Sequence, residues 1–170
     1  MTPTTIIVHH QAGFGSLESV DILHKERGFN KSSLGFYVGY HYYIDLSGII
    51  TPTRSDFEEG AHTLGGWNRC ALGLGFQGNT NLKPITEAQR SSHASLLRTL
   101  QERHNIPNSR IFSHSELWPT ECPGLNLNAI TRNYRRTDLF YIAVQVRRIA
   151  AVITEIAIRI KGRLKPKPQT

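Results

Sequence analysis

The chain has 170 residues, of which 39% are hydrophobic, and a formal net charge of +7 at pH 7. This length fits one domain with an extension, and no apolar run is long enough to span a bilayer. Residues 1–133 carry 11 basic and 11 acidic side chains, whereas residues 134–170 carry nine and two. We therefore expect a neutral domain over residues 1–133, a basic tail over residues 134–170 that meets an anionic surface, and no nucleic-acid partner.

The two cysteines and the N-terminus bear on the cellular compartment. Cys70 and Cys122 are too few for a disulfide framework, so we expect a free core thiol at Cys70 and a functional thiolate at Cys122. The first five residues, Met-Thr-Pro-Thr-Thr, lack the basic start and the small-residue cleavage site of a signal peptide. We therefore expect synthesis in the cytoplasm without Sec-type export.

In chain order, the first half predicts a strand, a helix and a hairpin. Residues 4–8 form a short, continuous β-branched run, which indicates a buried strand, and Ser16 can cap a helix from Leu17 to about Arg27. Residues 36–44 are rich in Tyr and Val and predict a strand. A turn then leads to a return strand over residues 49–51, which completes the hairpin.

The second half continues the alternation of strands and helices. Residues 71–76 alternate small and large apolar side chains, as a central strand can. Thr86 and Gln89 form a capping box that begins the clearest helix, and residues 111–112 predict a last short strand. Together these elements predict an α/β fold with a central mixed β-sheet flanked by helices. The histidines on the predicted helices are expected at the surface: His24, His93 and His104.

The tail is expected to form one amphipathic helix. Its apolar residues recur at heptad spacing, at Ile142, Val146, Ile149, Ile153, Ile156 and Ile160. The regular heptad favours a helix that packs on the body or self-associates. The basic residues favour a helix that binds anionic membrane lipid or outer-membrane lipopolysaccharide, and we prefer this second interpretation.

A histidine and a cysteine follow the last predicted strand, and their spacing is that of two metal ligands on one loop. His114 and Cys122 are eight residues apart, too far for a zinc-finger pair. This spacing suits two ligands of a catalytic zinc, provided that a third ligand arrives from elsewhere. His9 ends the first strand, so its imidazole can converge with that of His114 if the two strands are neighbours. His10 is the alternative ligand from that strand.

Five motifs occur in an order that resembles a known family. They are Ile7-Val8-His9-His10, Gly39-Tyr40-His41-Tyr42-Tyr43-Ile44-Asp45, Gly60-Ala61-His62, Asn68 with Leu72-Gly73, and His114 with Thr120-Glu121-Cys122-Pro123-Gly124. Together they resemble the zinc N-acetylmuramoyl-L-alanine amidases, the family shared by small phage endolysins and the peptidoglycan recognition proteins. The resemblance extends from about Thr4 to Ala129 and implies the fold of that family.

The resemblance also implies roles for individual residues. His9, His114 and Cys122 match the zinc ligands, and Tyr40 matches the catalytic tyrosine. Thr120 is placed as a second catalytic residue, where the phage branch often has a lysine and the recognition branch has a threonine.

Two further positions match the substrate groove of the family, His62 and Asn68. Both could instead brace their loop. The cytosolic recycling amidases look similar, but they use an aspartate at the position of Cys122 and a glutamate on the strand that contains Gly75. This chain therefore fits the phage-like and recognition branch better.

The function implied is hydrolysis of peptidoglycan, at the amide between N-acetylmuramic acid and L-alanine of the stem peptide. The resemblance suggests a phage or prophage endolysin, held in the host bacterial cytoplasm until lysis and then acting on the cell wall. The alternative is a non-catalytic peptidoglycan-binding module. Such modules usually lack the first histidine or the cysteine, and this chain has both.

Overall fold

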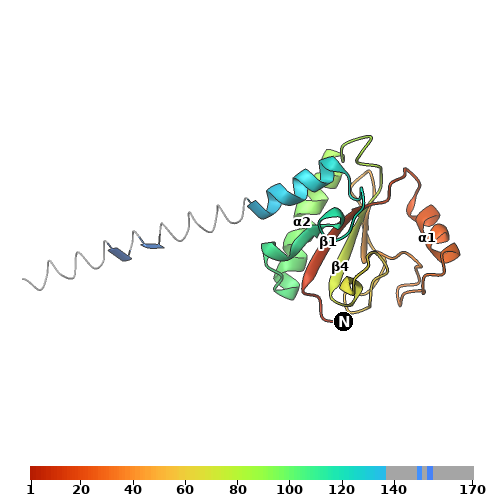
Figure 1. Cartoon of the computed structure of the whole chain (residues 1–170), viewed down its shortest axis with the longest axis horizontal. Coiled ribbons are helices and arrows are strands. Elements are labelled where there is room, and N and C mark those ends of the chain that lie inside the picture. The colour runs from red at the N-terminus through yellow and green to blue at the C-terminus, as the bar shows by residue number, and fades with distance from the viewer. Residues whose placement is uncertain (137–148, 151–152, 155–170) are drawn as a thin grey trace, which may run out of the picture. The chain divides into compact units, whose positions relative to one another are not determined.

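The computed structural model describes residues 1–136, 149–150 and 153–154 (Figure 1). The chain divides into two compact units, Met1–Arg135 and Arg136–Thr170, and each is considered by itself. The predicted tail helix lies mostly outside the described residues. Its described parts, 149–150 and 153–154, are helical, and Ile149 and Ile153 are more than half exposed.

Five strands form one mixed sheet in the order β3-β2-β4-β1-β5. The strands are β1 (Thr5–His10), β2 (Tyr42–Ile44), β3 (Ile50–Pro52), β4 (Ala71–Phe76) and β5 (Ile111–Ser113). β1 pairs in parallel with both β4 and β5, and β2 pairs in parallel with β4. Only β3 runs antiparallel, as the second strand of the hairpin. The predicted mixed sheet is confirmed.

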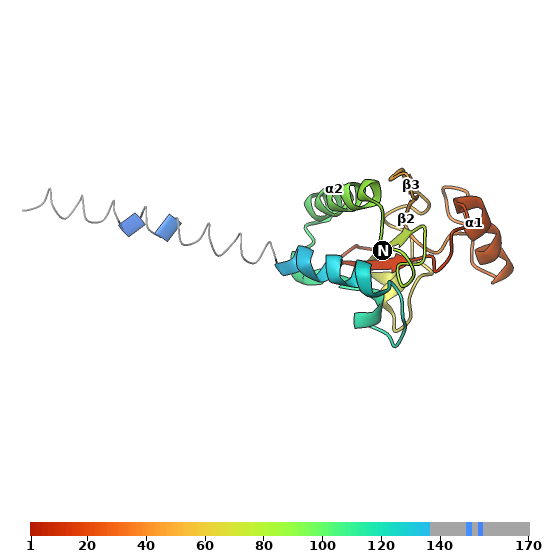
Figure 2. The same cartoon turned by 90° about the horizontal axis from the view of Figure 1, so that it is seen from above.

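Helices cover both faces of this sheet. α2 (Glu87–His104) and a helix over residues 125–136 lie on one side, and α1 (Leu17–Glu26) lies on the other (Figures 1 and 2). The capping box of α2 is present, with the Thr86 side chain accepting from the backbone N–H of Gln89 at 3.0 Å. Short 3-10 turns occur at Trp67–Arg69, Asn108–Arg110 and His114–Glu116.

The helix over residues 125–136 was not predicted. Its buried positions include Leu127 and Thr131, both fully buried. The Thr131 hydroxyl is satisfied by donating to the carbonyl oxygen of Leu127 at 2.8 Å, one turn earlier. Leu127, Ile130 and Tyr134 pack on the main core at helical spacing, and the buried polar Thr131 interrupts this apolar stripe.

The main hydrophobic core lies between the sheet and α2. Along β4, Leu72, Leu74 and Phe76 join this core, together with Leu97 and Leu100 of α2. The residues between them, Ala71, Gly73 and Gly75, point to the opposite face because side chains alternate along a strand. The two faces of β4 therefore differ sharply in side-chain size.

The predicted strand over residues 36–44 is wrong in its first part, because β2 begins only at Tyr42. The backbone N–H groups of Tyr37 and Val38 donate to the Asp21 carboxylate at 2.5 and 3.1 Å. The N–H of Gly39 donates to His24 Nδ1 at 3.0 Å. Side chains of α1 thus take the hydrogen bonds that a neighbouring strand would otherwise make.

The expected surface position of three histidines is also wrong. His24 and His93 are only 7% and 2% exposed, and the side chain of His104 is 7% exposed. His93 packs edge-on against the Phe76 ring, and His104 binds the Asp56 carboxylate at 2.7 Å. Each helix buries its histidine against a partner distant in sequence, which the local pattern does not reveal.

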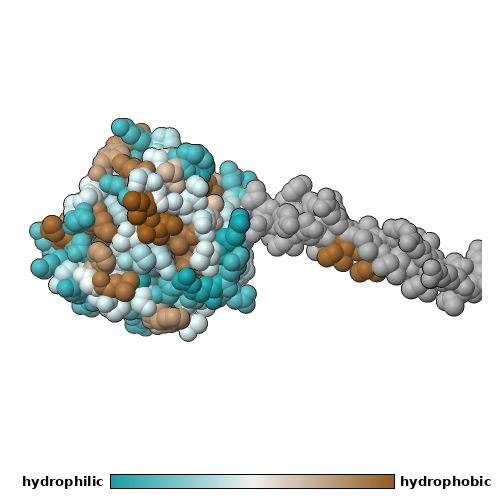
Figure 3. Space-filling model, turned by 180° about the vertical axis from the view of Figure 1, so that it is seen from behind, coloured by the Kyte–Doolittle hydropathy of each residue, from teal (hydrophilic) through white to brown (hydrophobic). Residues whose placement is uncertain are grey.

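The surface of the first unit carries scattered apolar side chains. Figure 3 shows separate brown areas among hydrophilic ones on the face behind the view of Figure 1. Phe57, Leu82 and Leu125 are the most exposed of the large apolar residues, at 65%, 72% and 82%. Isolated exposed apolar residues are normal on globular proteins and do not by themselves indicate a binding surface. Among the described residues, no helix combines the length and the apolar character needed to cross a membrane.

Candidate metal centre

The candidate site lies at the carboxyl ends of two neighbouring parallel strands. His9 is near the end of β1, and His114 directly follows β5. The register pairs Val8 with Ser113, so the two histidines come one residue later on adjacent strands. Ligands of open α/β sheets commonly bind at this edge.

The turn that carries His114 is held by Glu116. The Glu116 carboxylate accepts the backbone N–H of Ser113 at 2.8 Å and also binds Arg135. Glu116 therefore braces the loop after β5.

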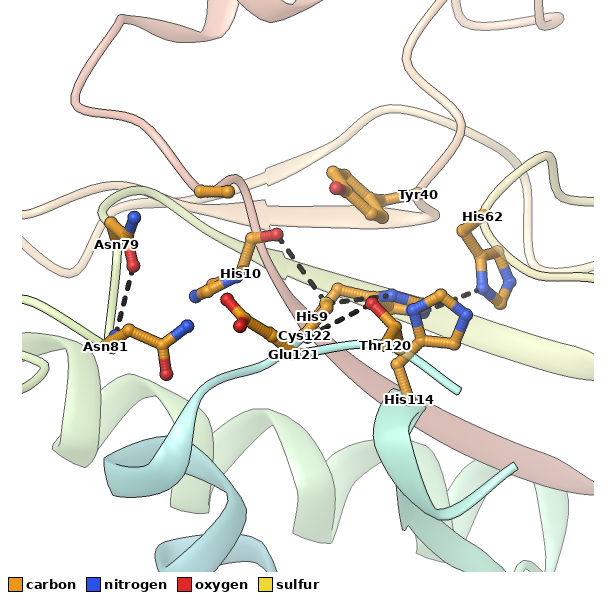
Figure 4. A pocket seen from close by; sticks show the side chains of 11 residues that line it. His9, His10, Tyr40, His62, Asn79, Asn81, His114, Thr120, Glu121 and Cys122 are labelled. Atoms are coloured by element: carbon orange, nitrogen blue, oxygen red, sulfur yellow. Dashed lines mark hydrogen bonds between the residues drawn. The ribbon is translucent and has the colours of Figure 1, made fainter. Parts of the chain in front are cut away.

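His9, His114 and Cys122 come together as a possible metal-binding group. One nitrogen of each histidine and the Cys122 sulfur all lie within 4.8 Å of one another. His9 Nδ1 is 3.6 Å from Cys122 Sγ, and the His9 and His114 ring centroids are 4.4 Å apart. Figure 4 shows the three side chains converging, with His9 on β1, His114 on the turn that follows β5 and Cys122 on the loop beyond it.

The hydrogen bond between His9 Nε2 and His62 leaves Nδ1 of His9 free to bind a metal. His9 Nε2 is 3.0 Å from His62 Nδ1, and His62 Nε2 is 3.2 Å from the carbonyl oxygen of Ala71. A carbonyl oxygen only accepts, so His62 donates from Nε2 and accepts from His9 at Nδ1. The lone pair of His9 is then on Nδ1, which faces Cys122. Two imidazole nitrogens and a thiolate are a set of three donors that suits a catalytic zinc ion.

Burial controls the protonation of this group in the metal-free chain. It holds the pKa of His9 well below the usual 6.5, and that of His62 at about 3, so both imidazoles are neutral at pH 7. Burial also lowers the pKa of His114. For Cys122, burial raises the pKa of the thiol to about 12. Neutral imidazoles are the form that binds metals, whereas the thiol must lose its proton.

A cavity of about 320 Å³ opens in front of the three candidate ligands. Tyr40, His62 and Thr120 line it, and all three also line a second cavity of about 390 Å³. Arg27 and Trp118 belong to the second cavity. These volumes are in the range of small-ligand sites in proteins.

Tyr40 is placed by a glycine on β4. A Cβ atom at Gly75 would lie 2.2 Å from Cδ2 of the Tyr40 ring, so only glycine leaves room for the ring. The ring centroids of Tyr40 and His9 are 5.3 Å apart. Burial is the main reason that the pKa of Tyr40 is raised above 10, which keeps the hydroxyl protonated as a donor.

Of the other residues considered for the site, Thr120 and His10 line the first cavity and Asn68 does not. Thr120 lines the cavity, and its Oγ1 accepts the backbone N–H of Cys122 at 3.2 Å. His10 also lines the cavity, but its Nδ1 accepts the backbone N–H of Thr80 at 3.1 Å and it is not in the metal-binding group. Asn68 lines neither cavity. Its side-chain oxygen accepts the backbone N–H groups of His62 and Thr63, and its amide donates back to Thr63, so it braces the loop.

Ala12, Asn79 and Asn81 are among the residues that line the first cavity without having been predicted. They follow β1 and β4, so their position after buried strands was the available signal. Ala12 has a φ of 61°, which is uncommon for a residue other than glycine.

The fold and the site define an α/β protein in which two histidines and a cysteine, at one edge of a mixed sheet, could hold a metal ion. The chain belongs to the N-acetylmuramoyl-L-alanine amidase family (Amidase_2), whose model matches residues 1–125. The resemblance drawn from the motifs is confirmed, as is the fold of that family.

The similar proteins include both branches of the resemblance. Peptidoglycan-recognition protein SC2 of Drosophila melanogaster is 32% identical over 126 residues, which cover 71% of this chain and 68% of that protein. The structure of the N-acetylmuramoyl-L-alanine amidase LysC from Clostridium intestinale URNW has a TM-score of 0.68 at 31% identity, covering 79% of this chain and 86% of that chain. Apis mellifera PGRP-SA shares the fold, with a TM-score of 0.68 at 19% identity over 79% of this chain and 84% of that chain.

Proposed function

We propose that this chain is a zinc-dependent peptidoglycan hydrolase that cleaves the amide between N-acetylmuramic acid and L-alanine of the stem peptide. The observation that carries the proposal is the convergence of His9, His114 and Cys122 at a cavity lined by Tyr40. Membership of the amidase family supports the same reaction.

The three converging side chains would hold the metal. When bound, zinc supplies Lewis acidity toward water and toward the substrate carbonyl. Because His9 donates from Nε2 to His62, its Nδ1 is the nitrogen available for zinc. Cys122 would bind as the thiolate, so loading the site at pH 7 releases the thiol proton.

Tyr40 and Thr120 are the donors that this chain offers to the reacting amide. The hydroxyl of the half-buried Tyr40 stays protonated and has no hydrogen-bond partner among the described residues, so it is free to donate to the oxyanion that develops on the carbonyl oxygen. The Thr120 oxygen already accepts from Cys122, which leaves its own proton available toward the cavity. Donors fixed before the reaction stabilise such charge without reorganising.

A comparison of the two cysteines tests the proposal. We expect Cys122→Ala to lose stoichiometric zinc in elemental analysis and to lose at least about 1,000-fold of the turbidity decrease of purified cell walls. Cys70→Ala is the matched control, since Cys70 is a half-buried thiol outside the metal-binding group. Full activity of Cys122→Ala would refute the proposal. A wild-type chain that binds peptidoglycan but never clears it would support the binding-module alternative.

We also propose that the enzyme is a phage or prophage endolysin, kept in the host cytoplasm until lysis. The structure of "Endolysine" LysCS from Clostridium intestinale URNW, at 31% identity and a TM-score of 0.68, supports this setting. Expression inside a bacterium together with a membrane-permeabilising protein should lyse the culture, whereas expression alone should not. Lysis without permeabilisation would contradict the proposal.

For the basic tail, we propose binding to an anionic envelope surface, on the basis of its nine basic residues. Deleting residues 139–170 should reduce co-sedimentation with anionic lipid vesicles and leave hydrolysis of purified walls unchanged. Unchanged vesicle binding by the truncated chain would favour self-association instead.

A further inference from the structure

Among the described residues, His62 is the neighbour that bonds Nε2 of His9, at 3.0 Å. The two rings meet edge to face, at a centroid distance of 4.9 Å and an interplanar angle of 76°. His62 is not in the group of possible ligand atoms. Its Nε2 donates to the Ala71 carbonyl of β4, which leaves Nδ1 as an acceptor directed at His9.

We propose that His62 is a positioning residue that holds His9 as the Nε2–H tautomer, with the Nδ1 lone pair directed at the metal. The inference rests on the metal site of the proposed function. It assigns His62 a role different from substrate binding, although the residue still lines both cavities. A metal-binding histidine generally needs such a partner to fix its ring and its tautomer.

The backbone around His62 leaves a slot for its ring. A Cβ at Gly73 or at Gly60 would lie 2.5 Å from Cδ2 of the His62 ring, so glycine at both positions makes the space. The loop that presents the ring is anchored by Asn68, which accepts the backbone N–H of His62 at 3.0 Å. Ring and backbone are therefore held by separate contacts.

His41 is a nearby histidine that plays a different part. Its Nδ1 accepts the backbone N–H of Gly73 at 3.0 Å, and its Nε2 is 3.0 Å from the carbonyl oxygen of Glu58. Both of its ring nitrogens bind backbone, so His41 joins β4 to the loop before His62. Of these two histidines, His62 is the one whose ring nitrogen bonds a candidate ligand, so its role is positioning, whereas that of His41 is bracing.

Within the described part of the chain, His114, the other candidate histidine ligand, has no hydrogen-bond partner of the kind that His62 provides to His9. Its Nε2 is buried and has no hydrogen-bond partner among the described residues. His9 is therefore the histidine of the pair whose orientation a protein side chain sets. The effect of removing His62 should appear first in metal affinity.

A pair of equally shaped substitutions tests the inference. His62→Asn places an amide oxygen where His62 Nδ1 stands and keeps an acceptor for His9, whereas His62→Leu has the same shape without an acceptor. Both variants lose the bond to Ala71, so that loss cancels in the comparison. Zinc dissociation constants would be measured on the full chain by competition with a chromophoric chelator, and the visible spectrum of the Co²⁺-loaded chain would report the geometry.

We expect His62→Leu to bind zinc about 10- to 100-fold more weakly than wild type and to change the Co²⁺ spectrum. His62→Asn should stay within about threefold of wild type and keep the spectrum, since the acceptor remains. Equal weakening in both variants, or unchanged affinity in His62→Leu, would overturn the inference.

The outcomes also separate this inference from the proposed function. A wild-type chain that binds zinc but hydrolyses no peptidoglycan would refute the function and leave the His62 result valid. A chain that hydrolyses peptidoglycan while His62→Leu keeps full zinc affinity would refute only the inference. A wild-type chain without zinc affinity would overturn both.

Discussion

The two faces of the central sheet differ in how they are packed, although the same strands form both. On the face toward α2, Leu72, Leu74 and Phe76 of β4 pack against the buried leucines of the helix. On the opposite face, Gly73 and Gly75 leave space that the rings of His62 and Tyr40 fill. One face is stabilised by side chains of the strands, and the other is shaped by loops that lie over glycines.

The apolar face mainly determines the stability of the fold, and the polar face carries the candidate metal site. The apolar face is built from buried hydrophobic side chains, so its contribution to the free energy of unfolding is large and has little directional character. The polar face depends on a few directional contacts, such as the bond between His9 and His62. Substitutions on the two faces should therefore affect different measurements.

The largest effect on stability is expected from Leu97→Ala on the apolar face. Leu97 is fully buried in the core cluster, and truncating such a residue costs about 3–5 kcal/mol of unfolding free energy. Turnover per folded molecule should stay unchanged. Urea unfolding and wall-clearing rates measure the two quantities. Leu82→Ala, at a residue 72% exposed, is the control and should change neither.

The opposite pattern is expected from Tyr40→Phe on the polar face. The ring should keep its place over Gly75, while the loss of the hydroxyl donor should slow hydrolysis by about 100-fold. Unfolding free energy should change little. Tyr37→Phe serves as the control because Tyr37 lines neither cavity. Unchanged turnover of Tyr40→Phe would remove this tyrosine from the mechanism.

The smallest effect concerns pH and a histidine buried on the apolar face. Burial lowers the pKa of His93 to about 4, against 6.5 when the residue is exposed. The unfolded chain therefore binds more protons between pH 6.5 and 4, and stability falls as the pH falls through that window. From pH 7 to pH 5 the His93 share is about 2 kcal/mol.

The variant His93→Leu isolates that share. Its unfolding free energy should fall less than that of wild type between pH 7 and pH 5, by the amount assigned to His93. Above pH 7 the pH dependence of the two chains should be parallel. Equal losses on acidification would show that His93 is protonated as readily in the folded chain as in the unfolded one.

The sequence predicted the apolar face better than the polar one, for a physical reason. Strand β4 and the capping box of α2 follow from local patterns. On the polar face, the family motifs named His9, His114 and Cys122, but not the contacts that hold these side chains in place. The role of Asp21 in replacing a strand partner at Tyr37 depends on a contact between elements distant in sequence.

The site shows the same limit at Gly75. The glycine was visible in the sequence, but the ring that occupies the space beside it comes from Tyr40, 35 positions earlier in the chain. The bond from His62 to His9 likewise joins a loop to a strand. Such contacts depend on tertiary packing, which periodicity and composition do not encode.

Mass spectrometry of peptidoglycan digested by the zinc-loaded chain tests the central claim most directly. We predict free stem peptides with a new amino terminus at L-alanine, together with glycan strands whose lactyl groups are unsubstituted, and neither product from the Cys122→Ala chain. Products with new sugar reducing ends or with cuts inside the stem peptide, or intact peptidoglycan after prolonged digestion, would contradict the amidase function.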